Sequence, residues 1–78
     1  MPTVQKILQK MHSQPNGIRF DEISKVLRHY GYTLVRQKGS HCQFYNYDTD
    51  DLITVKKEST VKRVYVEDVL FRINERKK

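Results

Sequence analysis

The stretch YTLVRQKGSHCQFY, residues 32–45, decides the fold because its side chains follow the two-residue period of a β-strand. Residues 32–37 and 40–45 are rich in β-branched and aromatic side chains, which are typical of strands. The Lys38–Gly39 step between them predicts a tight turn. This stretch is therefore expected to form an antiparallel β-hairpin.

Two helices are predicted before this hairpin. Thr3 is the expected N-cap of the first helix and Asp21 that of the second. Residues 13–17 contain Pro15 and an Asn-Gly pair, which separate the two helices. Gly31 follows the second helix, where a left-handed residue is favoured. The apolar residues of each helix recur at helical spacing: Val4, Ile7, Leu8 and Met11 in the first, and Ile23, Val26, Leu27 and Tyr30 in the second.

A third strand and a third helix are predicted after the hairpin. Leu52 to Lys56 forms the strand, which a polar turn over residues 46–51 joins to the hairpin. Residues 57–63 are polar and basic and predict a loop. Glu67 and Asp68 are then expected in the first turn of the last helix, where the helix dipole favours acidic groups. Its apolar stripe consists of Val66, Val69, Leu70 and Ile73. The predicted order ααβββα describes one α+β domain over residues 1–78, with a three-stranded antiparallel sheet packed on helices.

The size and charge of the chain limit the kinds of site it can carry. A domain of 78 residues has too small a core to enclose a deep cleft, so any active site is expected on an open face. Fifteen basic side chains against nine acidic ones give a net charge of +6, which favours a polyanion such as RNA. The single cysteine and the lack of an apolar leader indicate a cytoplasmic protein that is not bound to a membrane.

Alternation along the second strand divides its side chains between two faces. Cys42 and Phe44 point one way and are expected to pack against the helices. His41, Gln43 and Tyr45 point the other way, onto the face that such a sheet shows to water. RNA is expected to lie on this face.

His41 is the candidate catalytic residue. An imidazole changes protonation near neutral pH and can remove the proton of a ribose 2′-hydroxyl, which then attacks the adjacent phosphate without a metal or another cofactor. Other side chains near the hairpin are candidates for RNA binding or transition-state support: Arg36, Lys38, Gly39, Ser40, Gln43, Tyr45, Lys56 and Lys57. The plainer interpretation is that Gly39 makes the turn, Ser40 satisfies a backbone group and His41 is an ordinary surface residue.

Residues 31–44, GYTLVRQKGSHCQF, resemble the signature of HicA-type toxins, which has a glycine, an aromatic, an arginine and then Gly-Ser-His. The resemblance covers about residues 17–74, with residues 1–16 as a helical extension and 75–78 as a frayed tail. It implies a fold like that of double-stranded-RNA-binding domains, cleavage of mRNA with His41 as the catalytic residue, and a HicB-type antitoxin partner. Family members often carry a second histidine where Cys42 stands. They also often carry proline and histidine after the third strand, where residues 56–60 are KKEST.

The sequence argues against a metal-dependent or thiol-based function. The spacing of the three histidines and Cys42 does not suit zinc, and the Asp48–Asp51 segment fails as a calcium loop, so no metal site is expected. Cys42 is expected to be a buried thiol. Tyr45 and Tyr47 are candidates for stacking on bases, although cross-strand packing explains Tyr45 equally well. The alternatives to a ribonuclease are a non-catalytic RNA-binding module and a domain whose basic face binds an acidic protein.

Overall fold

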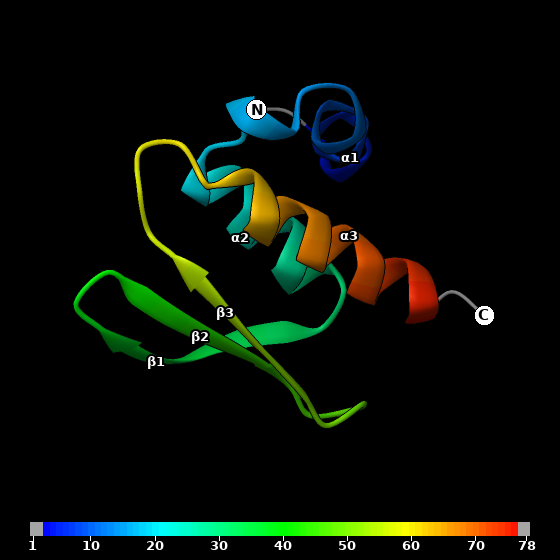
Figure 1. Cartoon of the computed structure of the whole chain (residues 1–78). Helices are drawn as coiled ribbons and strands as arrows, with labels where there is room; N and C mark the ends of the chain where they lie inside the picture. The colour runs from blue at the N-terminus through cyan, green and yellow to red at the C-terminus, as the bar shows by residue number, and fades with distance from the viewer. Residues whose placement is uncertain (1–2, 77–78) are drawn as a thin grey trace.

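The structure is a computed structural model that describes the backbone of residues 3–76 and the side chains of residues 3–73. It confirms the predicted α+β order ααβββα (Figure 1). The helices are α1 (Val4–Ser13), α2 (Phe20–His29) and α3 (Arg63–Arg76), with a single 3-10 turn, η1 (Pro15–Gly17), after α1. The strands are β1 (Tyr32–Lys38), β2 (His41–Asn46) and β3 (Asp51–Lys56).

The three strands form an antiparallel meander in the order β1-β2-β3. Helices α2 and α3 lie on one face of this sheet, and α1 packs against α2 and α3 on the side away from the strands (Figure 1). Within the described residues no helix covers the other face, which is called the open face below. The candidate site lies on this face.

The core lies between the helices and the covered face of the sheet. The predicted stripes are confirmed, because Ile7 and Met11 of α1 are fully buried together with most of the stripe residues of α2 and α3. Cys42 and Phe44 are buried from the sheet side, as strand alternation predicts. The other buried apolar residues are Ile18, Ile23, Val26, Leu27, Tyr32, Ile53, Val55, Val61, Val66, Val69 and Ile73.

The turn of the β1–β2 hairpin differs by one residue from the prediction. Lys38 pairs with His41, so Gly39 and Ser40 form the turn, and Lys38 is the last residue of β1. Gly39 has a φ of 60°, and Ser40 is not among the residues with positive φ. A positive φ at the first of two turn residues is what a type II′ turn requires, and glycine adopts it without strain. The glycine therefore determines which two residues turn.

Helix α2 starts one residue before the predicted cap, Asp21. Its N-cap is Arg19, whose backbone N–H donates to the carboxylate of Glu22 at 2.9 Å. Starting at Phe20 also brings that ring onto the core, where it lies 6.3 Å from the ring of Phe44. The predicted cap at Thr3 is confirmed, because its hydroxyl accepts a hydrogen bond from the backbone N–H of Lys6 at 3.3 Å.

Helix α3 also starts earlier than expected, at Arg63, so its first turn contains no acidic residue. Glu67 lies one turn in and accepts a hydrogen bond from Arg63 at 2.9 Å, an i,i+4 pair that replaces the expected interaction with the helix dipole. The helix runs to Arg76, and residues 77–78 of the tail that was expected to fray lie outside the described residues. None of the helices in the described range has both the length and the apolar character needed to cross a lipid bilayer.

The turn between β2 and β3 is shorter than predicted, because Asn46 and Asp51 pair with each other as strand residues. The side chain of Asn46 is buried and hydrogen-bonded on both sides. Its amide nitrogen donates to the carbonyl of Tyr30 at 3.0 Å, and its oxygen accepts from the backbone N–H groups of Asp48 and Thr49. This asparagine therefore joins the end of α2 to the β2–β3 turn.

Candidate nucleic-acid interface

Side chains on the open face are arranged in rows across the strands, because residues directly opposite one another on paired strands project to the same side. The three rows are the histidine row (Lys38, His41, Lys56), the glutamine row (Arg36, Gln43, Thr54) and the tyrosine row (Thr33, Tyr45, Leu52). The histidine row lies next to the β1–β2 turn. From there the face changes from cationic, through one arginine beside two uncharged polar side chains, to largely apolar.

A β-bulge in β1 places two of the cations on this face. The pairing of β1 with β2 shifts between Leu34 and Arg36, so that Arg36 rather than Val35 lies opposite Gln43. Without this shift Arg36 would lie opposite Cys42, a core-facing residue of β2, and Lys38 would project to the same side as Arg36. A bulge redirects the side chains that follow it, and here it brings both cations to the face that carries His41, with Lys38 opposite His41 and Arg36 opposite Gln43. Simple alternation along β1 does not predict this arrangement.

His41 begins β2 at the end of the sheet and is exposed. It lies between Lys38 on β1 and Lys56 on β3, its direct cross-strand neighbours on either side. Among the described residues none forms a hydrogen bond or ion pair with the imidazole of His41 or with the charged groups of the two lysines. An exposed imidazole flanked by two unpaired ammonium groups is well placed to meet a phosphodiester.

An open groove of about 560 Å³ runs across the histidine and glutamine rows. Its lining residues are Arg36, Lys38, Gly39, His41, Gln43 and Thr54. Five of these six are among the site residues predicted from the sequence. Thr54 was missed, because its position opposite Gln43 depends on the register between β2 and β3, and nothing in the sequence around Thr54 marks it.

Four other predicted site residues lie outside the groove. Lys56 belongs to the histidine row but not to the groove lining, and Tyr45 lies in the tyrosine row, where its ring centroid is 4.7 Å from that of Tyr47. The Ser40 carbonyl accepts a hydrogen bond from the backbone N–H of Lys57 at 2.6 Å, which ties the hairpin turn to the end of β3. The Lys57 ammonium lies 5.6 Å from the ring centroid of Phe20 and so is directed toward α2.

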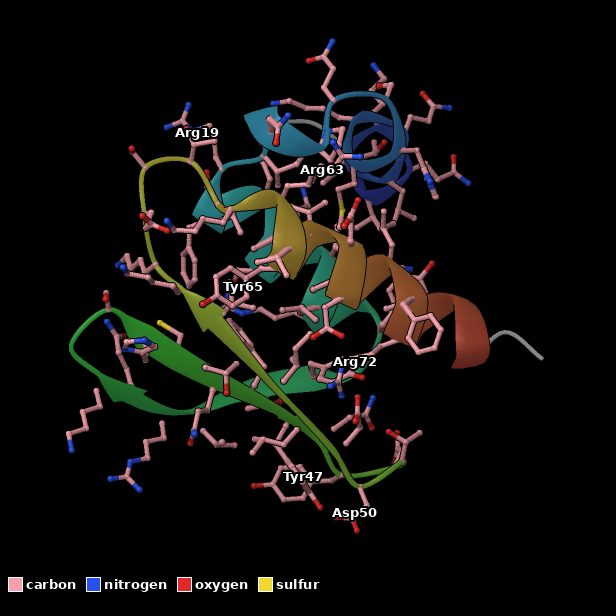
Figure 2. The ribbon with its side chains drawn as sticks, viewed as in Figure 1. Arg19, Tyr47, Asp50, Arg63, Tyr65 and Arg72 are labelled. Carbon is pink, nitrogen blue, oxygen red and sulfur yellow. The ribbon has the colours of Figure 1, made fainter. Side chains whose placement is uncertain are left out.

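Asp48, Asp50 and Asp51 lie away from His41, whereas Glu58 follows Lys56 at the His41 end with one carboxylate oxygen buried. Asp48 and Asp50 lie in the β2–β3 turn, at the other end of the sheet, where Figure 2 shows Asp50 beside Tyr47. Asp51, which starts β3, is paired with Arg72 of α3. An anion therefore meets unpaired cations at the His41 end and carboxylates at the opposite end.

The same region offers neither a reactive thiol nor a metal site among the described residues. Cys42 is fully buried on the covered face, so its thiol lies on the side of the sheet opposite His41, as expected from alternation. Across the described residues no three histidine, cysteine, aspartate or glutamate side chains come together in a way that could hold a metal ion. The exposed chemistry of this end of the sheet is therefore that of His41 and the cations around it.

Comparison with known proteins assigns the family. The family model described as the HicA toxin of bacterial toxin–antitoxin matches residues 20–73. No curated protein and no solved structure matches the chain. The family match begins with α2, contains the whole sheet and ends in α3, so it includes the β1–β2 hairpin and every residue of the groove. Because it covers well over half of the chain, this protein belongs to the HicA toxin family of bacterial toxin–antitoxin systems.

Proposed function

We propose that this HicA toxin is an endoribonuclease that cleaves mRNA with His41 as the general base and without a metal ion. The observation that carries the proposal is the histidine row, in which an exposed imidazole stands between two lysines on the uncovered face of the sheet. The open groove beside it suits a polymer that passes across the surface, because it has no closed walls to exclude long substrates.

The reaction needs only groups that RNA and this face supply. His41 accepts the proton of a ribose 2′-hydroxyl, and the resulting oxygen attacks the neighbouring phosphorus atom. The bond from phosphorus to the 5′-oxygen breaks, and that oxygen takes up a proton from the solvent. The products are a 2′,3′-cyclic phosphate and a free 5′-hydroxyl, so no external nucleophile or oxidant is consumed.

Lys38 and Lys56 support the transition state in this mechanism. Side chains directly opposite on antiparallel strands have Cβ atoms about 4.5–5.5 Å apart, so both ammonium groups can reach a phosphate held at His41. Negative charge grows on the non-bridging oxygens as the 2′-oxygen attacks, and cations fixed beside them stabilise it. The 2′-hydroxyl is required for the reaction, and DNA of the same sequence is therefore not cut.

The test compares three proteins on one single-stranded RNA in EDTA at neutral pH: wild type, His41→Ala and His12→Ala. His12 is an exposed histidine on α1, outside the family match, and serves as the matched control. Wild type and His12→Ala are expected to produce 5′-hydroxyl ends at equal rates. His41→Ala is expected to lose at least a hundredfold in rate, the typical contribution of a positioned general base.

The test requires that His41→Ala still folds. Because His41 is an exposed strand residue, its replacement is expected to leave the fold intact. Replacing His41 is expected to change the free energy of unfolding by no more than about 0.5 kcal/mol, as for other surface substitutions. Equal cleavage by wild type and His41→Ala would remove His41 from the mechanism. Salt-sensitive RNA binding by wild type with no cleavage would instead favour the non-catalytic RNA-binding module.

As a toxin of this family, the protein acts with an antitoxin partner. We propose that this partner is a HicB-type protein that covers the open face and inhibits the toxin by blocking the groove. The cationic histidine row requires acidic or hydrogen-bonding groups from whatever covers it. Expression of the toxin alone is expected to arrest growth, and co-expression of a HicB-type antitoxin is expected to restore it. Lys38→Glu is expected to weaken the complex of the two proteins. Unchanged affinity in that variant would place the antitoxin on another surface.

A further inference from the structure

Two residues of the glutamine row, Gln43 and Thr54, have a chemistry that phosphate binding does not explain. Gln43 lies at the centre of β2 with its side chain half-buried, and Thr54 lies directly opposite it on β3. Both side chains line the groove. Neither the amide of Gln43 nor the hydroxyl of Thr54 forms a hydrogen bond with another described residue. The groove therefore contains an uncharged set of unused donors and acceptors next to the cations.

The glutamine row lies a defined distance from the histidine row. Gln43 follows His41 by two residues on the same face of β2, which corresponds to about 6.6–6.8 Å along the strand. An RNA strand whose scissile phosphate meets His41 and which runs along β2 therefore brings a neighbouring nucleotide over Gln43 and Thr54. The groove spans both positions without interruption.

From this arrangement we infer that Gln43 and Thr54 read the base of the nucleotide beside the cleaved phosphate and so determine the sequence at which the toxin cuts. The inference rests on the proposed ribonuclease function, because it takes the histidine row to bind the RNA backbone and Gln43 and Thr54 to bind a base of the same RNA strand. The lysines of the histidine row bind the backbone, which is the same in every sequence. The amide of Gln43 has a donor and an acceptor side by side and can form two hydrogen bonds with the edge of one base.

This role also defines the class of substrate. The Watson–Crick edge of a base can reach Gln43 only when it is not paired with another base, so the nucleotide at the glutamine row must be single-stranded. Tyr45, one row further along β2, offers an aromatic side chain on the same face to the following nucleotide. We therefore expect cleavage in unpaired segments of mRNA and none within a continuous duplex.

The experiment uses the purified full-length chain and a pool of single-stranded RNA with a randomised central segment. The ends produced are sequenced, which gives the base preference at each position around the cut. The variants are Gln43→Ala, Gln43→Glu and Thr54→Val. Gln5→Ala is the matched control, because Gln5 is an exposed glutamine of α1 outside the groove.

Wild type and Gln5→Ala are expected to share a preference for one base at one position next to the cut, by roughly five- to a hundredfold. Gln43→Ala is expected to keep cutting while this preference falls to about twofold or less, and Thr54→Val should weaken it in part. Gln43→Glu has acceptors only, and we expect the preferred base at that one position to change. These changes should be confined to a single nucleotide.

Several results would overturn the inference. One is an unchanged base preference in Gln43→Ala. Another is a folded Gln43→Ala protein that no longer cuts at all, which would make Gln43 part of the cleavage machinery. A wild type that cuts with no preference at any position would also overturn it, and in that case the ribonuclease proposal would stand. A wild type that cuts no RNA would remove both.

Discussion

Arg72 of α3 donates a hydrogen bond from Nη1 to a carboxylate oxygen of Asp51, the first residue of β3. The same guanidinium donates from Nε to Asp68 at 3.0 Å and from Nη1 to the carbonyl of Leu52 at 3.2 Å. The hydroxyl of Tyr32 donates to the other carboxylate oxygen of Asp51. Arg72 points from α3 toward the sheet in Figure 2, so one side chain fastens the last helix to the start of β3.

The environment of Arg72 favours the protonated, charged form of its guanidinium. Partial burial lowers its pKa, but hydrogen bonds and charge interactions with Asp51 and Asp68 outweigh this and raise the pKa above its ordinary value. Replacement by methionine keeps most of the packing volume and removes these hydrogen bonds. We expect Arg72→Met to lower the free energy of unfolding by about 1–3 kcal/mol, measured by urea denaturation.

The control for Arg72 is Arg63→Met, which breaks an exposed i,i+4 pair with Glu67 on the same helix. Such pairs contribute only about 0.3–0.5 kcal/mol, because both charges remain solvated. Equal losses in the two variants would show that the link from α3 to β3 contributes no more than a surface ion pair.

A second prediction separates the two glycines that have a positive φ. Gly31, at the end of α2, has a φ of 94°, and a Cβ atom there would lie 3.1 Å from the amide nitrogen of Asn46. Gly39 has a φ of 60°, and a Cβ atom there would meet nothing within 4 Å. Backbone strain costs about 1–2 kcal/mol at either position, but only Gly31→Ala also displaces a buried, hydrogen-bonded side chain. Thermal unfolding should therefore show a larger loss for Gly31→Ala, and a larger loss for Gly39→Ala would contradict this.

Helix α1 lies before the family match, yet it completes the core of this chain. Met11 is fully buried, and Lys10 on the same helix is paired with the largely buried carboxylate of Glu22 at 3.1 Å. We expect Met11→Ala to lower the free energy of unfolding by about 2–5 kcal/mol, in the range for large-to-small core substitutions. Gln9→Ala, an exposed change on the same helix, should have almost no effect. Near-equal stability of the two variants would mean that α1 packs only loosely on the rest of the fold.

Periodicity was sufficient to predict the helices and strands of this fold, the buried stripes of the helices and the two faces of β2. The helical stripe of α2 and the alternation of Cys42 and Phe44 in β2 both place apolar side chains where the structure buries them. The boundaries were less accurate, because they depend on single contacts. The Arg19–Glu22 hydrogen bond that starts α2 involves no side chain with a strong capping preference at the first position.

The sequence predicted most of the residues that line the groove but not how they are arranged on the sheet. Alternation along β2 predicts that His41 and Gln43 share the exposed face, and the structure agrees. The same rule applied to β1 places Arg36 on the wrong face, because it does not include the bulge after Leu34. Thr54 enters the groove only through the register of two strands, and register depends on contacts between segments that are distant in sequence.

The histidine row leads to a final prediction about salt. Each phosphate neutralised on a single strand contributes about 0.7 to the slope of log K against log salt concentration, because a condensed counterion is released. We expect Lys38→Met to reduce that slope by about 0.7 in the His41→Ala background, where RNA is bound without being cut. Lys6→Met removes the same charge from an exposed position on α1, away from the open face, and should leave the slope unchanged. The slopes of the two variants are measured by fluorescence anisotropy with a labelled single-stranded RNA across a series of salt concentrations. If Lys6→Met lowered the slope as much as Lys38→Met, RNA binding would reflect the net charge of the chain and not the row of cations around His41.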